Sequence, residues 1–227
     1  MNATRPPTDR VRVKRLPKRG HYDRSIVDAI LDEALVCHVG FVADGQPHVV
    51  PTIHARDGDR LYVHGSAASR TLRALGDGVP VCVTATIVDG LVLARSAFHH
   101  SMNYRSVMVL GTAVEVTHPA QKLAGLRAVA EHVAPGRWDE IRPPSRQELR
   151  QTSLLRLGLD EASAKVRSGP PIDDEDDLSL AVWAGELPIR SVTLPAVPDP
   201  LLAPGIPPPA WLARYDRRVQ GPPRRGS

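Results

Sequence analysis

Three of the four Asp-Gly pairs in the first half of this chain each stand between two strand-like runs of apolar residues. The pairs are Asp44-Gly45, Asp57-Gly58 and Asp89-Gly90. An Asp-Gly pair favours the two-residue turn between antiparallel strands, because that turn needs positive φ angles, which glycine adopts freely. Parallel strands would need long crossovers, usually helices, and the rhythm of such a sheet is missing. The pattern predicts a mainly β fold, a small antiparallel barrel with peripheral helices.

Hydrophobic periodicity places the remaining elements around these turns. We predict strands over residues 37–43, 48–56, 61–63, 79–88, 91–95, 104–117, 154–159 and 162–166. Apolar residues at helical spacing predict helices over 24–35, 66–75, 119–133 and 146–150. Asp23 is expected to cap the first of these helices.

Charge and proline content set the expected domain boundaries. Residues 1–20 carry seven Lys or Arg against one Asp, and residues 211–227 carry five Arg against one Asp. We expect residues 1–20 to form a basic mobile tail, 21–170 the folded domain, and 171–227 a Pro-rich extension that wraps the barrel or is partly disordered. Because the remaining body is mildly acidic, no specific nucleic-acid partner is expected.

The cysteines and the longest apolar runs bound the environment of the protein. Cys37 and Cys82 are too few for a disulfide framework or a cysteine metal site, and both are expected in the core. No apolar run approaches the roughly 18 residues of a membrane span, and no secretory signal pattern follows the basic start. We therefore expect a cytoplasmic protein without a membrane partner.

The segment from Leu61 to Leu72 carries the clearest functional signal. A short strand passes through His64-Gly65 into small residues and then into a helix. Amide groups at such a helix start can hold a phosphate, together with the hydroxyls of Ser66 and Ser69 and the guanidinium of Arg70. The alternative is an ordinary helix capped by Ser66, with its arginines in water.

Other site types find little support in the sequence. The adjacent residues His99 and His100 would point to opposite faces of a strand, so they cannot both bind one metal, and no metal site is predicted. The motifs of serine hydrolases, dinucleotide-binding folds and P-loop enzymes are not present. Lys165 and Arg167 are either solvated or reach a cofactor phosphate, and Trp183 either anchors the tail or covers a partner's site.

Four segments, in this order, resemble the pyridoxamine 5′-phosphate oxidase-like family of FMN-binding split barrels, near its nitroimidazole-resistance reductases. The segments are Leu31–Phe41, Val49–Ile53, His64–Leu72, and Asn103–Val107 with Gly111. The resemblance covers about residues 15–170 and implies an antiparallel, homodimeric split barrel. Family members commonly have a lysine or histidine near the phosphate helix, where this chain has Arg70-Thr71; arginine also binds phosphate.

The resemblance also implies which residues bind the cofactor. One strand would lie along the isoalloxazine ring, a second segment would border the ribityl chain and phosphate, and a third would approach from the second subunit. In this order, the residues are Val50, Pro51, Thr52 and Ile53; His64, Gly65, Ser66, Ser69 and Arg70; and Tyr104, Arg105 and Ser106.

The physical requirements of FMN agree with this assignment. An arginine beside a helix start suits a dianion, and a β-rich cleft rimmed by Pro51, Ile53 and Val83 would suit the flat ring. We expect an FMN-dependent oxidoreductase, of nitroreductase or oxidase type, that transfers two electrons between a donor and a small molecule. Its catalytic residues are not assigned, because the flavin carries the redox chemistry. The alternative is a non-catalytic flavin- or haem-binding carrier or sensor, and haem or a deazaflavin are the alternatives to FMN.

Overall fold

The computed structural model describes residues 5–76 and 78–215, apart from the side chains of Arg70, Thr71 and Arg73. The strands are β1 (Gly20–His21), β2 (Val36–Ala43), β3 (Gln46–Asp57), β4 (Arg60–Ser66), β5 (Pro80–Leu93), β6 (Ser101–Thr112), β7 (Val114–Glu115), β8 (Thr152–Gly158), β9 (Glu161–Arg167) and β10 (Gly185–Pro188). The α-helices are α1 (Arg24–Glu33), α2 (Arg70–Gly76), α3 (Pro119–Val133) and α4 (Arg146–Gln151). Short 3-10 helices are η1 (Asp9–Val11), η2 (Pro17–Arg19), η3 (Ala97–His99), η4 (Trp138–Glu140), η5 (Glu175–Ser179) and η6 (Leu212–Arg214).

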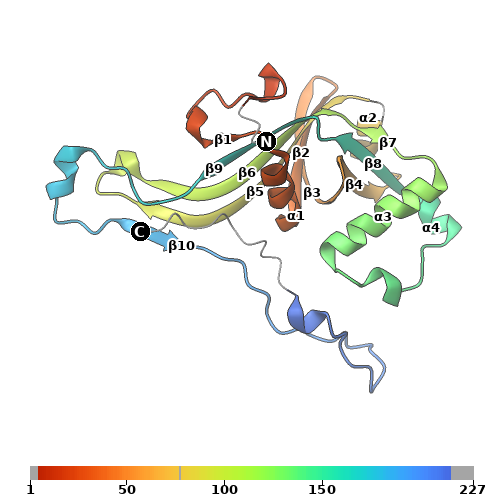
Figure 1. Cartoon of the computed structure of the whole chain (residues 1–227). Helices are drawn as coiled ribbons and strands as arrows, with labels where there is room; N and C mark the ends of the chain where they lie inside the picture. The colour runs from red at the N-terminus through yellow and green to blue at the C-terminus, as the bar shows by residue number, and fades with distance from the viewer. Residues whose placement is uncertain (1–4, 77, 216–227) are drawn as a thin grey trace.

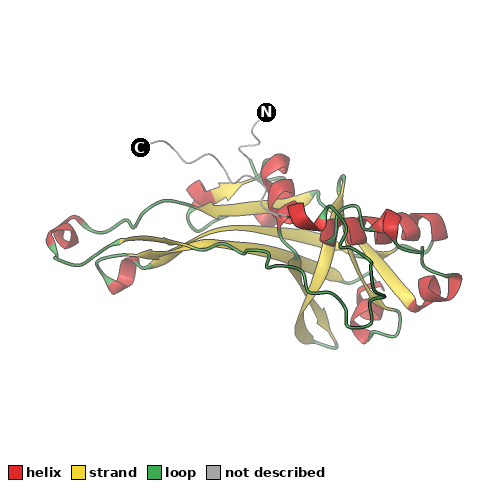
Figure 2. Cartoon of the chain, turned by 90° about the horizontal axis from the view of Figure 1, so that it is seen from below, coloured by secondary structure: helices red, strands yellow, loops and turns green. Residues whose placement is uncertain are grey.

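The strands form one curved sheet in the order β1-β9-β6-β5-β2-β3-β4-β8-β7, with β10 added on β5 (Figures 1 and 2). Every pair of neighbours is antiparallel. This confirms the predicted mainly β, antiparallel split-barrel architecture with helices outside. None of the described helices is long and apolar enough to cross a membrane.

Two apolar clusters hold the fold together. The larger lies inside the curved sheet, where Val27, Ile30 and Leu31 of α1 pack on inward-facing strand residues. The smaller lies on the other face of β4 and β8, where Tyr62 and Leu154 meet α3 at Val129. The helices are therefore placed by their apolar faces, as the periodicity predicts.

The Asp-Gly pairs behave in different ways. Asp44 and Gly45 form the predicted two-residue turn, with φ angles of 51° and 74°. The prediction for Asp89-Gly90 is wrong, because β5 continues through it as a β-bulge in its ladder with β6. Gly90 leaves room for β10: a Cβ there would lie 2.9 Å from the Leu187 carbonyl oxygen. A glycine inside a strand pattern often marks a bulge or a close approach of another backbone segment.

The two ends of the described chain are more structured than expected. Residues 5–20 do not form a free tail: Val11 is fully buried, and β1 pairs with β9. Thr8 and Arg10 also bond to the Glu161 carboxylate at 2.6 and 2.9 Å. Between residues 171 and 215 the chain forms only η5, β10 and η6 and is otherwise irregular; the sequence analysis missed β10.

The cysteines occupy different environments. Cys37 is buried in the core as predicted, and burial raises the pKa of its thiol to about 12. Cys82 is only half-buried, because it pairs with Gly40 on the outer face of the sheet. Its expected place in the core is therefore wrong.

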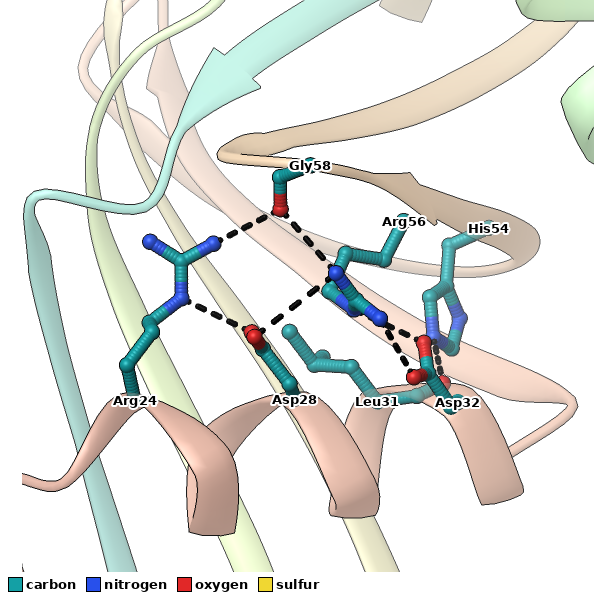
Figure 3. A network of polar contacts seen from close by, with 7 residues as sticks. All are labelled: Arg24, Asp28, Leu31, Asp32, His54, Arg56 and Gly58. Carbon is teal, nitrogen blue, oxygen red and sulfur yellow. Dashed lines mark hydrogen bonds and ion pairs between the residues drawn. The ribbon is translucent and has the colours of Figure 1, made fainter.

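A polar network fixes α1 against the turn between β3 and β4 (Figure 3). Arg56 of β3 donates two hydrogen bonds to the Asp32 carboxylate, at 2.8 and 2.6 Å. Arg24 links Asp28 to the Gly58 carbonyl, and His54 lies 2.9 Å from the Leu31 carbonyl oxygen. These contacts hold the end of β3 that directly follows the predicted flavin strand Val50–Ile53.

Candidate functional site

The predicted site lies where β3 changes partner. Residues 46–53 of β3 pair with β2, whereas residues 54–57 pair with β4. The last pair of the β3–β4 ladder is His54 with Val63, and beyond it β4 pairs with β8 on its other side. The β3–β4 ladder therefore ends between Ile53 and His64, and the first two predicted segments lie on the two sides of this end of the ladder, called the opening here.

The residues of the first segment alternate between the two faces of the sheet. Val50 and Thr52 face inward with the buried residues Val39 and Cys37, because cross-strand partners share a face. Pro51 and Ile53 face outward and are exposed. Only this outward pair can present an apolar surface to a ring.

The predicted cleft of Pro51, Ile53 and Val83 is wrong. Val83 is buried and pairs with Val39, so it lies on the inner face. One cleft cannot be lined from opposite faces of the sheet. The sequence pattern did not show this, because the register between β2 and β5 depends on tertiary pairing.

The turn between β4 and α2 differs from the predicted strand-to-helix junction. β4 does not end at Val63 but runs to Ser66, because Gly65 and Ser66 pair with Ser153 and Thr152 of β8. Helix α2 begins at Arg70 rather than Ser66. The Ser69 hydroxyl accepts the Leu72 amide at 3.4 Å, so Ser69 rather than Ser66 caps this helix.

The amide groups in this turn are already engaged. The Ala67 amide donates to the Gln151 carbonyl at 2.9 Å, and the Ser69 amide to the Ser66 carbonyl at 2.9 Å. The Ala68 amide donates to the Ser66 hydroxyl at 3.2 Å. A phosphate here would therefore depend on the first turn of α2 and on Arg70, whose side chain lies outside the described residues.

His64 borders the opening and has an unusual environment. Desolvation lowers the pKa of its imidazole below the ordinary value, which favours the neutral ring. Its Nδ1 is buried and has no hydrogen-bond partner in the described structure. A buried polar atom of this kind usually meets a water or a ligand group, so His64 fits the predicted place beside the ribityl chain.

The third predicted segment lies apart from the other two within one chain. Tyr104, Arg105 and Ser106 are on β6, and β5 and β2 separate β6 from β3. Neighbouring strands are about 4.8 Å apart, which places β6 roughly 14 Å from β3. Within one chain this segment does not adjoin the end of the β3–β4 ladder, and its approach to a flavin from a second subunit, which the resemblance implies, stays a prediction.

Arg105 has a structural role in this chain. Its guanidinium bonds to Glu33 of α1 at 2.5 and 2.8 Å and to Asp89 of β5 at 2.9 and 2.8 Å. The hydrogen bonds with Glu33, and then those with Asp89, raise the pKa of Arg105 above its ordinary value. Its predicted contact with a cofactor stays untested.

Arg167 is buried. The alternative in which this residue is solvated is therefore wrong. Arg167 donates to the Asn103 side chain and to the carbonyl oxygens of Gly169 and Pro170. Asn103 in turn donates to Glu186 of β10 at 2.5 Å. This cluster clamps β10 to β6 and β9, and the sequence analysis missed it because the three residues lie far apart along the chain.

One cavity inside the barrel, among the described residues, is far too small for a flavin. This cavity of about 10 Å³ lies among core side chains that include Val39, Leu61 and Leu155. This volume suits at most one water-sized group. Among the described residues, no group of three His, Cys, Asp or Glu side chains is arranged to hold a metal ion.

Comparison with known proteins gives the family context of this site. Residues 23–166 match the family model described as pyridoxamine 5′-phosphate oxidase. No curated protein matches the sequence.

Two solved structures match this chain at more than 30% sequence identity. The flavocytochrome Anf3 from Azotobacter vinelandii is 43% identical, with a TM-score of 0.88, and the match covers 93% of this chain and 98% of that one. The FAD and haem binding protein from Mycobacterium smegmatis is 35% identical, with a TM-score of 0.83, and the match covers 86% of this chain and 96% of that one.

A structure described as a 5-nitroimidazole antibiotic resistance protein, from Bacteroides thetaiotaomicron, is 23% identical with a TM-score of 0.55. The match covers 65% of this chain and 86% of that one, and at this identity it shows the fold alone.

Proposed function

Because this chain belongs to the pyridoxamine 5′-phosphate oxidase family, we propose that it is a flavin-dependent oxidoreductase that also carries a haem. The observation that carries the proposal is the 43% identity, over 93% of this chain, to a protein named a flavocytochrome. The second relative, named for binding both FAD and haem, supports the same pair of cofactors. The haem part rests on these two relatives.

The flavin part also draws on the geometry of this chain. The flavin would lie at the opening between β3 and β4, held by Val50–Ile53 and His64–Ser66. Exposed Pro51 and Ile53 offer an apolar surface, and the unpartnered Nδ1 of His64 needs a polar group. Ser69 and Arg70 would bind its phosphate, and Tyr104–Ser106 of a second subunit would complete the site of a homodimer.

When bound, the flavin supplies hydride and single-electron transfer. The protein's part is then to orient the cofactor, admit a small substrate and electron donor, and limit access of water. FMN is the form that the family resemblance implies, and FAD is the form named for one relative. We place this activity in the cytoplasm, in keeping with the sequence.

The absorbance spectrum of the purified protein tests the proposal. We expect the two visible bands of an oxidised flavin together with a Soret band, and mass analysis of the released cofactor identifies the flavin. Bleaching by a nicotinamide donor, followed by recovery with oxygen or a nitroaromatic compound, would support an enzyme. A bound flavin that no donor reduces would favour a carrier or sensor, and a protein with neither chromophore would contradict the proposal.

Arg70→Ala tests the phosphate assignment. Removing a charge-assisted contact should weaken flavin binding by about 1.5–3 kcal/mol. Fluorescence titration of the apoprotein with FMN and with FAD gives the affinity. Unchanged affinity for both would show that Arg70 does not contact the phosphate.

A further inference from the structure

Residues 190–215 form a long segment, called the strap here, that leaves the sheet after β10 (Figure 1, blue). Both of its ends are fixed to the body. At one end, the Ile189 amide donates to the Asp89 carbonyl at 3.0 Å. At the other, the Tyr215 hydroxyl donates to the Val133 carbonyl of α3 at 2.6 Å, and Thr193 donates across the base of the strap to the Tyr215 carbonyl. The strap is thus a closed loop held at its base.

The body of the strap exposes its apolar side chains. Val197 is 91% exposed and Leu201 is 92% exposed, and Val192 and Leu194 are 75% and 77% exposed. Seven prolines lie between Pro195 and Pro209 and keep this stretch extended and stiff. Exposed apolar residues clustered on one segment usually mark an interaction surface.

The match to one solved structure extends into the strap. The flavocytochrome alignment covers 93% of this chain, and residues 190–215 make up more than the remaining 7%. An extended segment that has no apolar core of its own becomes ordered when it binds to another surface.

The outer face of β2 and β3 offers a matching surface. Val36, Val42, Val49 and Ile53 are all exposed on these two strands, and Val49 is 67% exposed. Paired residues of the two strands share this face, so the side chains form one patch, in which the exposed His38 is a polar member between Val36 and Gly40. The patch includes Ile53 and flanks the predicted flavin strand.

We propose that the strap of one copy packs on the outer face of β2 and β3 in a second copy of this chain. In such a two-fold symmetric dimer, the strap of each copy packs on the β2–β3 patch of the other copy. Both apolar surfaces, which are exposed in the single chain, are then buried. The strap then covers the edge of the flavin opening that Pro51 and Ile53 form. The inference rests on the flavin site proposed above and adds that this site is incomplete without the second copy.

Sedimentation equilibrium of the whole protein tests the exchange. The wild type should be a dimer at micromolar concentration. Leu201→Asp in the strap and Val49→Asp on the patch should each weaken dimerisation at least tenfold, because each places a carboxylate in an apolar contact. Both side chains are exposed in the single chain, so circular dichroism should show unchanged folding. Val114→Asp, at an exposed apolar position on β7, is the matched control and should dimerise like the wild type.

A mixing experiment locates the contact. The Val49→Asp chain has an intact strap, and the Leu201→Asp chain has an intact patch. A mixture of the two variants should therefore form heterodimers with one intact contact and recover dimer that neither variant forms alone. No recovery, or a Leu201→Asp variant that dimerises normally, would overturn the proposal.

Flavin absorbance recorded on the same samples separates this inference from the proposed function. A wild-type monomer with bound flavin overturns the strap exchange and the proposed homodimer, and it leaves the proposed flavin-dependent activity intact. A strap-dependent dimer that binds no flavin supports the exchange and contradicts the flavin site.

Discussion

At the scale of single residues, a substitution of Arg105 tests whether this predicted cofactor-binding residue has a structural role instead. Its four hydrogen bonds join α1 to β5 and β6 through Glu33 and Asp89. Arg105→Ala leaves two carboxylates facing each other in a mostly buried place, so we expect a loss of about 2–3 kcal/mol in the free energy of unfolding. Urea unfolding of the apoprotein measures this loss.

The control for Arg105→Ala is a change at an exposed ion pair. Arg127→Ala removes the contact with Asp139, where both partners are solvated, and should leave the urea midpoint unchanged. If Arg105→Ala lowers flavin affinity and leaves the apoprotein equally stable, Arg105 acts on the cofactor and the structural interpretation fails.

His64 gives a pH dependence whose sign follows from its environment. Burial lowers the pKa of the folded state below the ordinary value of about 6.5, which the unfolded chain retains. As the pH falls through this value, the unfolded state takes up the proton first, so His64 makes the fold lose stability toward acid. Above the pKa of the unfolded state, the His64 ring is neutral in both the folded and the unfolded chain, and this loss of stability is absent.

His64→Gln should therefore reduce the fall in stability between pH about 7.5 and about 5.5. Urea midpoints of the apoprotein at the two pH values measure this difference. His100→Gln, at an exposed histidine of the β5–β6 loop, is the control and should keep the wild-type slope. An unchanged slope in His64→Gln would show that the ring is not desolvated in the fold.

At the scale of elements, Gly90 decides whether β10 can join the sheet. A Cβ at this position would lie 2.9 Å from the Leu187 carbonyl oxygen and 3.3 Å from the Pro188 Cα. These are backbone atoms, so β10 has to move away. Gly90→Ala should speed hydrogen exchange at residues 186–189, measured by mass spectrometry, because the β5–β10 ladder loosens.

A glycine elsewhere in the same sheet provides the comparison. A Cβ at Gly40 would lie 3.5 Å from the Cys82 carbonyl oxygen, an ordinary contact. Gly40→Ala should therefore leave exchange in β10 unchanged. Equal exchange rates in Gly90→Ala and the wild type would show that β10 tolerates the methyl group.

The elements that the sequence predicted correctly are those whose signal is local. Apolar spacing in α1 and the positive-φ turn at Asp44-Gly45 need no information from distant residues. β10 was missed because Gly185–Pro188 has no strand pattern and is a strand only through its ladder with β5. The Asp89-Gly90 error has the same origin.

The same difference between local signals and signals that depend on distant residues applies to the candidate site. The family resemblance implies that Val50–Ile53 and His64–Ser66 contact one cofactor, and in the structure both segments adjoin the end of the β3–β4 ladder. Which side chains share a face was not predictable, because strand register depends on pairing between distant segments. This explains the error at Val83, and it explains why Arg105 was not expected to bond to Glu33.

At the scale of the whole molecule, the division of the predicted site between β3 and β6 links cofactor binding to assembly. The strands that carry the two parts are separated by β5 and β2 in one chain. If the second subunit supplies Tyr104–Ser106, only the dimer has the complete site. A flavin that binds the dimer in preference to the monomer must also strengthen dimerisation, because the two equilibria are linked.

This linkage predicts that flavin is released on dilution. In a protein-concentration series, the fluorescence of free flavin should rise over the same range in which sedimentation shows the dimer dissociating. Excess flavin should move that range to lower protein concentration, by the square of the factor by which dimerisation increases flavin affinity at each of the two sites. In the Val114→Asp control, release should follow the wild-type curve. A flavin affinity that does not change across the monomer–dimer transition would place the whole binding site within one chain and remove the role of Tyr104–Ser106 from the second subunit.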